Sequence, residues 1–155
     1  MLEIERKFLV TSEDYQKEAT SKSYIIQGFL NSHPNRTVRV RVEGEKGFLT
    51  IKGISSKDGT TRFEWETKIP LEEAKKLLPL CEKGIIEKYR YKVFFEGNLF
   101  EIDEFLGENQ GLIIAEIELN EAHQAFEKPN WLGEEVTGQA KYYNSQLSKK
   151  PFKTW

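Results

Sequence analysis

The sequence begins Met1-Leu2-Glu3-Ile4-Glu5-Arg6-Lys7 and continues into the apolar Phe8-Leu9-Val10. This alternation predicts a β-strand, in which side chains two residues apart share a face. Glu3, Glu5 and Lys7 then lie on one face, opposite the apolar side chains. Two carboxylates about 7 Å apart repel each other by roughly 2 kcal/mol at an effective dielectric constant of about 20. The charged face therefore indicates either contact with solvent or half of a divalent-cation site, with a lysine beside it for an anion.

Length and charge limit the classes of function. The 155 residues are expected to form one domain, 1–155, with its own core. The 23 basic and 25 acidic residues nearly cancel, so no overall field points to nucleic acid or to an anionic membrane. The early charges leave no apolar region for a secretory signal, and no apolar run is long enough to span a membrane. We therefore expect a cytoplasmic protein with no nucleic-acid and no membrane partner.

Cysteine and histidine are too scarce to form a metal cluster. The chain has a single cysteine, Cys81, and two histidines, His33 and His123. Cys81 has no partner for an internal disulfide bond, and it follows an apolar helical pattern typical of packing. Both histidines lie near turn residues and are expected at the surface.

Seven later stretches repeat the alternation of apolar and charged side chains. We expect strands at 23–30, 36–42, 48–52, 62–69, 86–93, 100–103 and 113–119. Turn residues such as Asp58-Gly59 separate several of them, which predicts short connections and antiparallel pairing. Short helices are expected at 11–19, 120–126 and 139–147, and Pro70 begins a helix with an apolar stripe that can cover part of a sheet.

The polar faces of these strands carry charges that are sorted by sign. The like-charged pairs are Glu3 with Glu5, Arg39 with Arg41, Lys88 with Arg90, and Glu116 with Glu118. Strands that face solvent gain most from neighbours of opposite sign, so this sorting favours a ligand site. Two architectures remain open: a sandwich with its charged faces in water, or a closed barrel with a polar lumen and helices over its apolar outer wall.

The first stretch, Glu3-Ile4-Glu5-Arg6-Lys7, has the form Glu-x-Glu-x-Lys, and the chain resembles the CYTH superfamily, the triphosphate tunnel metalloenzymes, and especially its short bacterial members. The resemblance continues in order through Arg39-x-Arg41, Thr50-Ile51-Lys52, Glu64-x-Glu66, Glu87-Lys88-x-Arg90, Glu101-x-Asp103 and Glu116-x-Glu118, and in the tail through 131–137 and Lys141-Tyr142. A single Glu-x-Glu-x-Lys would be weak, whereas this ordered series is specific. The resemblance implies a mainly β fold: an eight-stranded antiparallel closed β-barrel with a charged lumen, helices packed outside and a C-terminal helix.

The resemblance also implies the roles of individual residues. The metal-binding set would be Glu3, Glu5, Asp103, Glu116 and Glu118, with Mg²⁺ or Mn²⁺ as the ion, because these hard cations prefer oxygen ligands. The triphosphate would be bound by Lys7, Arg39, Arg41, Lys52, Lys88, Arg90 and Lys141. Lys7, Glu5 and Glu118 would be catalytic, and Glu64 and Glu66 would be secondary acids that orient water or cations. Ion pairs inside the tunnel remain the structural alternative for the cations and for the two secondary acids.

The implied activity is metal-dependent hydrolysis of inorganic tripolyphosphate, or of a related nucleoside or thiamine triphosphate, with release of orthophosphate. The alternatives are a class IV type adenylyl cyclase and a non-catalytic polyphosphate- or nucleotide-binding module. Cyclisation needs a bound nucleoside, and the candidate inward residues are carboxylates and cations without a base-recognition motif. The family's cyclases resemble longer chains with a His-Phe pair ahead of the first motif, where this chain has Met1-Leu2. We therefore expect hydrolysis. The resemblance also implies a possible homodimer, because relatives are often homodimers.

One position departs from the family pattern. Short bacterial relatives commonly carry Gln-Gly-Tyr-Leu in the second strand, and the tyrosine is linked to the first-strand lysine. This chain has Gln27-Gly28-Phe29-Leu30. Phe29 has no hydroxyl group, so a lysine–tyrosine proton relay is not expected here, and the rate or the substrate preference would differ.

Overall fold

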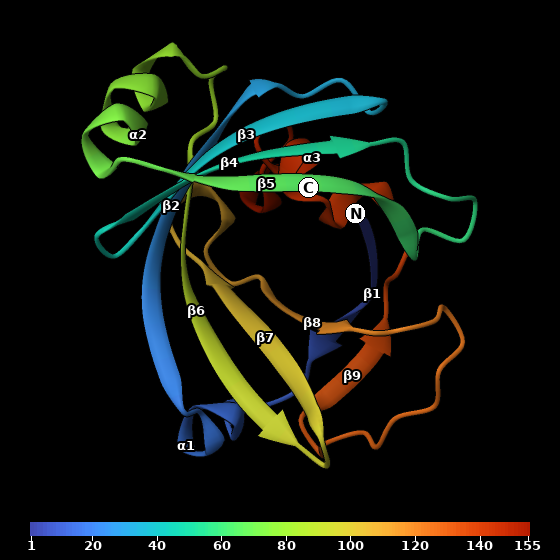
Figure 1. Ribbon diagram of the computed structural model, residues 1–155. Coiled ribbons are helices and arrows are strands. Elements are labelled where there is room, and N and C mark those ends of the chain that lie inside the picture. The colour runs from blue at the N-terminus through green and yellow to red at the C-terminus, as the bar shows by residue number, and fades with distance from the viewer.

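Nine antiparallel β-strands form one continuous sheet in the computed structural model, which describes residues 1–155. The strands are β1 (Leu2–Val10), β2 (Ser21–Asn31), β3 (Arg36–Glu43), β4 (Lys46–Gly53), β5 (Thr61–Ile69), β6 (Ile86–Phe95), β7 (Asn98–Phe105), β8 (Ile113–Glu118) and β9 (Leu132–Glu135). Their spatial order is β5-β4-β3-β2-β6-β7-β8-β1-β9, and an additional β5–β1 pairing closes β1 to β8 into a barrel (Figure 1). The predicted eight-stranded antiparallel closed barrel is confirmed. Outside it lies β9, a strand that is not among those predicted from the sequence.

Strand β1 closes the barrel because its two halves have different partners along one edge. Glu3 pairs with Arg62 of β5, whereas Phe8 pairs with Glu135 of β9. Along the opposite edge, residues from Glu5 onward pair with β8. The first strand therefore joins the two ends of the barrel sheet, and its charged face looks into the lumen.

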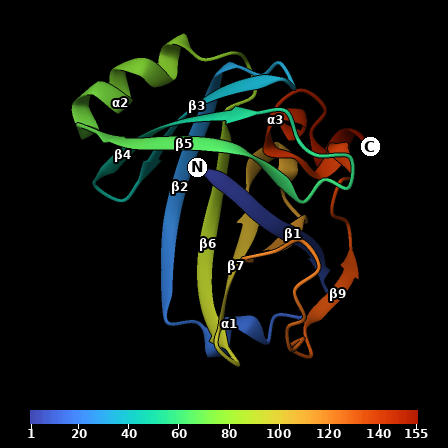
Figure 2. The same cartoon turned by 45° about the vertical axis from the view of Figure 1, so that its right-hand side comes forward.

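Helices lie outside the barrel or at its rim. They are α1 (Tyr15–Glu18), α2 (Leu71–Leu77), η1 (Leu78–Leu80), η2 (Gly107–Asn109), η3 (Ala140–Tyr142), α3 (Asn144–Leu147) and η4 (Phe152–Thr154). Helix α2 covers the outer wall, where Ala74 packs against Val40 and Val42 of β3, as the sequence predicted. Figure 1 shows α2 outside the barrel beside β3 and β4, and Figure 2 shows α1 at the lower end of β2 and β6. None of the helices has both the length and the apolar character needed to cross a membrane.

Aromatic packing covers the outer wall of β1, β7 and β8. Trp131, which is fully buried, contacts Tyr15 of α1 and Phe100 of β7 edge to face. Burial of a large aromatic side chain stabilises a fold by a few kcal/mol. Apolar side chains thus face outward into packed layers, and the polar side chains of the same strands are left to the lumen.

The helix predicted at 120–126 is absent. The backbone there forms one turn, in which Gln124 N donates to Glu121 O, and then continues without regular structure. Phe126 packs edge to face against Phe8 and Phe100 in the core. We attribute the irregular path to this packing, because it anchors one side chain to the barrel wall.

The C-terminal helix predicted at 139–147 is divided in two. Tyr143 has an extended backbone, with φ −69° and ψ 138°, and separates η3 from α3. Just before η3, Gly138 packs against Gly59 of the β4–β5 hairpin so closely that a Cβ atom on Gly59 would lie 2.2 Å from Gly138 Cα. Gly59 also has a positive φ of 79°, which favours glycine. The hairpin therefore holds the C-terminal segment at the barrel, and the break turns 143–145 towards the lumen.

Candidate functional site

The lumen contains a cavity of about 220 Å³ lined by 20 residues, of which only two are hydrophobic. The lining residues are Glu3, Glu5, Lys7, Phe29, Thr37, Arg39, Arg41, Thr50, Lys52, Arg62, Glu64, Glu66, Lys88, Arg90, Glu101, Glu116, Glu118, Tyr143, Asn144 and Ser145. All of them lie on barrel strands except the last three, which come from the C-terminal segment. The charged lumen implied by the family resemblance is confirmed, and of the two architectures that the alternation left open, the structure has the closed barrel.

Strand alternation places the charges. On β3, Arg39 and Arg41 line the cavity, whereas Val40 between them is fully buried in the outer layer under α2. The same period of two brings Lys88 and Arg90 of β6 into the lumen. The charged side chains are thus held by a closed hydrogen-bonded wall that cannot easily rearrange.

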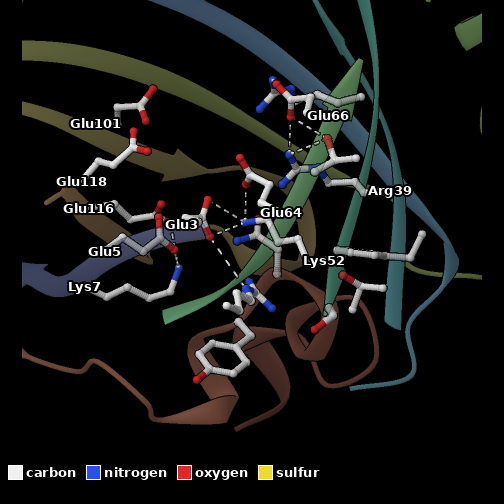
Figure 3. A pocket seen from close by; sticks show the side chains of 18 of the residues that line it. Glu3, Glu5, Lys7, Arg39, Lys52, Glu64, Glu66, Glu101, Glu116 and Glu118 are labelled. Carbon is white, nitrogen blue, oxygen red and sulfur yellow. Dashed lines mark hydrogen bonds and ion pairs between the residues drawn. The ribbon is translucent and has the colours of Figure 1, made fainter. Parts of the chain in front are cut away.

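One wall of the cavity is acidic. Strands β1, β7 and β8 are adjacent, and their register sets Glu5 opposite Glu118 and Glu101 opposite Glu116. Like charges directly opposite each other on neighbouring strands destabilise a sheet unless a cation or a proton intervenes. Figure 3 shows these carboxylates gathered on one side, with Arg39 and Lys52 across the cavity. This wall is therefore suited to a cation.

The opposite wall carries cations that are paired with acids. Lys52 Nζ lies 2.9 Å from Glu3 Oε1 and 3.3 Å from Glu64 Oε2. Arg39 and Arg41 each approach Glu66 at 3.5 Å. The structure thus contains the ion pairs that were the alternative reading of Glu64 and Glu66. The same geometry leaves Arg39 Nε and Arg41 Nε buried without an acceptor, so both guanidinium groups retain donor capacity for an anion.

Lys7 is a cation that forms ion pairs with carboxylates of the acidic wall. Its Nζ lies 2.8 Å from Glu116 Oε1 and 3.4 Å from Glu5 Oε1. Burial and the nearby Glu116 raise the pKa of the Glu5 carboxyl to about 7. Burial acts in the same direction on Glu116, but Lys7 and Arg90 outweigh it and hold the pKa of Glu116 well below its usual range. Glu5 is therefore the carboxyl of this pair that takes up a proton near neutral pH, whereas Glu116 stays ionised.

Asp103 lies near the cavity but does not line it. Its Oδ1 accepts from Arg90 Nε at 2.8 Å, and its Oδ2 accepts from Arg90 Nη2 at 3.0 Å and lies 2.9 Å from Lys88 Nζ. Asp103 and Lys88 are each only 1% exposed. In this arrangement Asp103 is paired with two cations, and the metal-ligand role implied by the resemblance stays a prediction.

Lys141 is the predicted phosphate ligand that the structure places outside the lumen. It is exposed, and its Nζ lies 4.6 Å from the ring centroid of Trp155 and 5.2 Å from that of Tyr142. The physical reason is the division of the predicted helix, because η3 turns Lys141 outward while the extended Tyr143 turns the next residues inward.

Several lining residues were not among the predicted site residues. Arg62 lies on the same strand face as Glu64 and Glu66, so the period of two could have identified it. Glu101 shares a face with Asp103 in the same way. The segment at 143–145 carried no such signal, because it belongs to no strand.

Phe29 lines the cavity from β2 and is 6% exposed. Its position is that of the tyrosine of the short bacterial pattern, so the departure noted in the sequence lies within the site. Tyr143 supplies the cavity's phenol instead, and Lys7 Nζ lies 5.9 Å from the centroid of its ring.

The donor set of the acidic wall suits a hard divalent cation in its chemistry. No three histidine, cysteine, aspartate or glutamate side chains lie close enough together to hold a metal ion as they stand. Glu116 and Glu3 instead make ion pairs with Lys7 and Lys52. The carboxylates nevertheless come from adjacent strands with directly opposed registers. Carboxylate oxygens are the ligands that Mg²⁺ and Mn²⁺ prefer, so the residues present fit such an ion.

Comparison with known proteins gives concordant matches over nearly the whole chain. A family model described as the CYTH domain matches residues 1–151. An inorganic triphosphatase of Acetivibrio thermocellus is 50% identical over 154 residues, which cover 99% of this chain and 97% of that protein. An inorganic triphosphatase of Nitrosomonas europaea is 38% identical over 153 residues, with coverage of 96% and 97%. A solved crystal structure of an inorganic triphosphatase superposes with a TM-score of 0.66 at 34% identity, over 94% of this chain and 96% of that one.

Proposed function

The chain belongs to the CYTH family, and from this we propose that it is an inorganic triphosphatase that hydrolyses tripolyphosphate and releases orthophosphate. The observation that carries the proposal is the lumen itself. Seven cationic and seven carboxylate side chains line one cavity of about 220 Å³, and four of the carboxylates lie together on one wall. Catalysis of phosphoryl transfer consists mainly of positioning and electrostatic stabilisation, and this lumen supplies both.

The cavity also favours an inorganic triphosphate over a nucleotide. Its volume is below the roughly 300–1,000 Å³ of pockets that enclose drug-sized ligands. Phe29 and Tyr143 are the only hydrophobic lining residues. A nucleoside needs apolar surface for its base, whereas a phosphate chain needs only charges and hydrogen-bond donors.

We propose that the basic residues of the lumen bind the phosphate chain. The set is Lys7, Arg39, Arg41, Lys52, Lys88 and Arg90, together with Arg62. Arginine forms bidentate contacts with phosphate, and lysine acts as a compact point charge. Their present carboxylate partners keep these charges neutralised before the anion enters.

We propose that Glu5, Glu116 and Glu118 hold Mg²⁺ or Mn²⁺, with Glu3 at the edge of the set. A bound ion would neutralise charge that develops on the phosphate oxygens. Lys7 would interact with the phosphate from beside this wall, and Glu5 and Glu118 would orient the attacking water, which makes these three the catalytic residues. Glu64 and Glu66 would serve as secondary acids that orient the cations, and Asp103 as a positioning residue for Arg90 and Lys88.

Some expectations from the sequence stay predictions. We propose that residues 1–155 act as one domain, because the barrel spans β1 to β8 and the C-terminal segment returns to its cavity. The cytoplasmic location, the homodimer and the absence of a nucleic-acid partner also stay predictions.

The decisive experiment compares products and substrates. Released orthophosphate is measured with tripolyphosphate, ATP and thiamine triphosphate, each with Mg²⁺ or Mn²⁺. Tripolyphosphate is expected to be hydrolysed at least as fast as the others. Cyclic AMP and pyrophosphate as the main products from ATP would replace this proposal with an adenylyl cyclase.

A further inference from the structure

The cavity has one lining amide, Asn144, which the proposed roles leave without a function. Asn144 is the first residue of α3 and follows the extended Tyr143. It lines the cavity together with Tyr143 and Ser145, the only lining residues outside the strands. Its side chain is therefore brought to the charged lumen by the C-terminal segment rather than by strand alternation.

Two donors fix the orientation of this amide. Asn144 Oδ1 accepts from Gln27 Nε2 at 2.8 Å and from Lys88 Nζ at 3.0 Å. An ammonium group can only donate, so the oxygen of the amide must face Lys88 and the nitrogen must face away. Gln27 is fully buried, and Lys88 is held in turn by Asp103 at 2.9 Å. The amide is thus oriented by two partners that are themselves buried.

The amide nitrogen has donor capacity that the protein does not use. No acceptor in the protein takes a hydrogen bond from Asn144 Nδ2, and the buried side-chain atoms without a partner are Gln27 Oε1, Arg39 Nε and Arg41 Nε. Nδ2 is therefore accessible rather than enclosed, on a residue that lines the cavity. It would present two N–H groups beside the cations that the proposed function assigns to phosphate.

We propose that Asn144 is a substrate-binding residue whose Nδ2 donates to a phosphate oxygen of tripolyphosphate next to Lys88. A neutral amide adds a hydrogen bond to the anion and no further charge to a lumen already rich in cations. The contact recognises the phosphate chain and not an organic group attached to it. This inference rests on the proposed function, because it takes tripolyphosphate as the ligand of the cavity.

The test measures the dissociation constant of sodium tripolyphosphate by calorimetry in EDTA, where turnover does not interfere, and KM with Mg²⁺. A hydrogen bond to a charged group contributes enough that Asn144→Ala is expected to weaken binding by about tenfold or more. The matched control is Gln146→Ala, which removes an amide from the same helix that does not line the cavity and is expected to change binding less than about twofold. Unchanged binding by Asn144→Ala overturns the proposal.

Two further variants separate direct contact from support of Lys88. Asn144→Asp keeps an oxygen acceptor for Lys88 and Gln27 but replaces the donor, so it is expected to bind tripolyphosphate no better than Asn144→Ala. Recovery of wild-type affinity by Asn144→Asp overturns the proposal. In a Lys88→Met background, Asn144→Ala is expected to weaken binding further, because a direct contact does not need Lys88. No further loss in that background would also contradict it.

The two proposals fail in different ways. If the wild-type protein binds tripolyphosphate without hydrolysing it, the proposed function fails while the binding comparison still decides the role of Asn144. If the wild-type protein hydrolyses tripolyphosphate and the Asn144 variants bind it as the wild type does, only the inference about Asn144 fails.

Discussion

The ammonium group of Lys7 on β1 lies 2.8 Å from Glu116 Oε1 on β8, and the register of the two strands places these residues directly opposite each other. The pair joins the proposed phosphate-binding residues to the proposed metal-binding residues. Opposite charges in a buried site stabilise each other, so both side chains can be kept ionised inside the barrel. In the proposed complex, phosphate would take the place of Glu116 as the partner of Lys7, and the metal ion would take the place of Lys7 as the partner of Glu116.

The first prediction concerns the acidic wall. The variants Glu5→Gln, Glu116→Gln and Glu118→Gln are expected to remain folded and to lose triphosphatase turnover by orders of magnitude, because an amide keeps the shape of the side chain but removes its charge. Turnover and circular dichroism would be measured together. The control is Glu121→Gln, an exposed residue beyond β8, which is expected to behave as the wild type. Near-normal turnover in the folded Glu5, Glu116 and Glu118 variants would rule out this wall as the metal site.

The second prediction concerns the two faces of β3. Val40→Asp places a carboxylate in a fully buried apolar position and is expected to destabilise the protein by about 4 kcal/mol or more, as measured by urea denaturation. Arg41→Ala is expected to leave the fold intact and to weaken tripolyphosphate binding. Arg36→Ala is the control, because Arg36 lies on the same strand but is exposed. Equal affinities of Arg41→Ala and the wild type would contradict the assignment of Arg41 to the substrate.

The third prediction separates two roles for Asp103. Asp103→Asn leaves two buried cations, Lys88 and Arg90, with a weaker partner, so it is expected to lower the free energy of unfolding by about 3–5 kcal/mol. The measurement is made in EDTA. Glu118→Gln is the comparison, because Glu118 is exposed and makes no ion pair, and it is expected to change stability by less than about 0.5 kcal/mol. An unchanged free energy of unfolding for Asp103→Asn would favour the metal-ligand role instead.

The fourth prediction follows from the raised pKa of Glu5. The folded protein keeps a proton on Glu5 up to about pH 7, whereas the unfolded chain releases it near the ordinary value of 4.5. The free energy of unfolding should therefore fall as pH rises between these values, by about 1.4 kcal/mol per pH unit and roughly 3 kcal/mol in all. Urea denaturation of the metal-free wild type and of Glu5→Gln across this range measures the difference. Parallel pH curves for the two proteins would show that Glu5 carries no such proton.

The sequence by itself determined which side chains face the lumen within each strand. Side chains of a strand alternate between its faces whatever its partners are, so the parity of residues such as Glu5, Arg41 and Lys52 assigned them correctly to the polar face. The parity of Val40 likewise assigned it to the apolar face, which the structure buries under α2.

The register of the strands, and with it the depth of each side chain along the barrel, was decided only by the tertiary structure. Asp103 has the parity of Glu101, yet it lies enclosed by Arg90 and Lys88 while Glu101 lines the cavity. The alternation of side chains predicts which face of the sheet a residue lies on. It does not predict how deep in the barrel the residue lies or which side chains surround it there. Those depend on pairings between strands that are distant in the sequence.

The C-terminal segment shows most clearly which features the local sequence pattern does not predict. Nothing in the local pattern predicted that Lys141 would point outward and Asn144 inward, because the segment has no alternation and its helix is interrupted at Tyr143. Its position depends on the contact of Gly138 with Gly59, and on Tyr142 and Leu147 in an apolar cluster with β6 to β8. Alternation is a property of a few consecutive residues, whereas these contacts exist only after the barrel has closed.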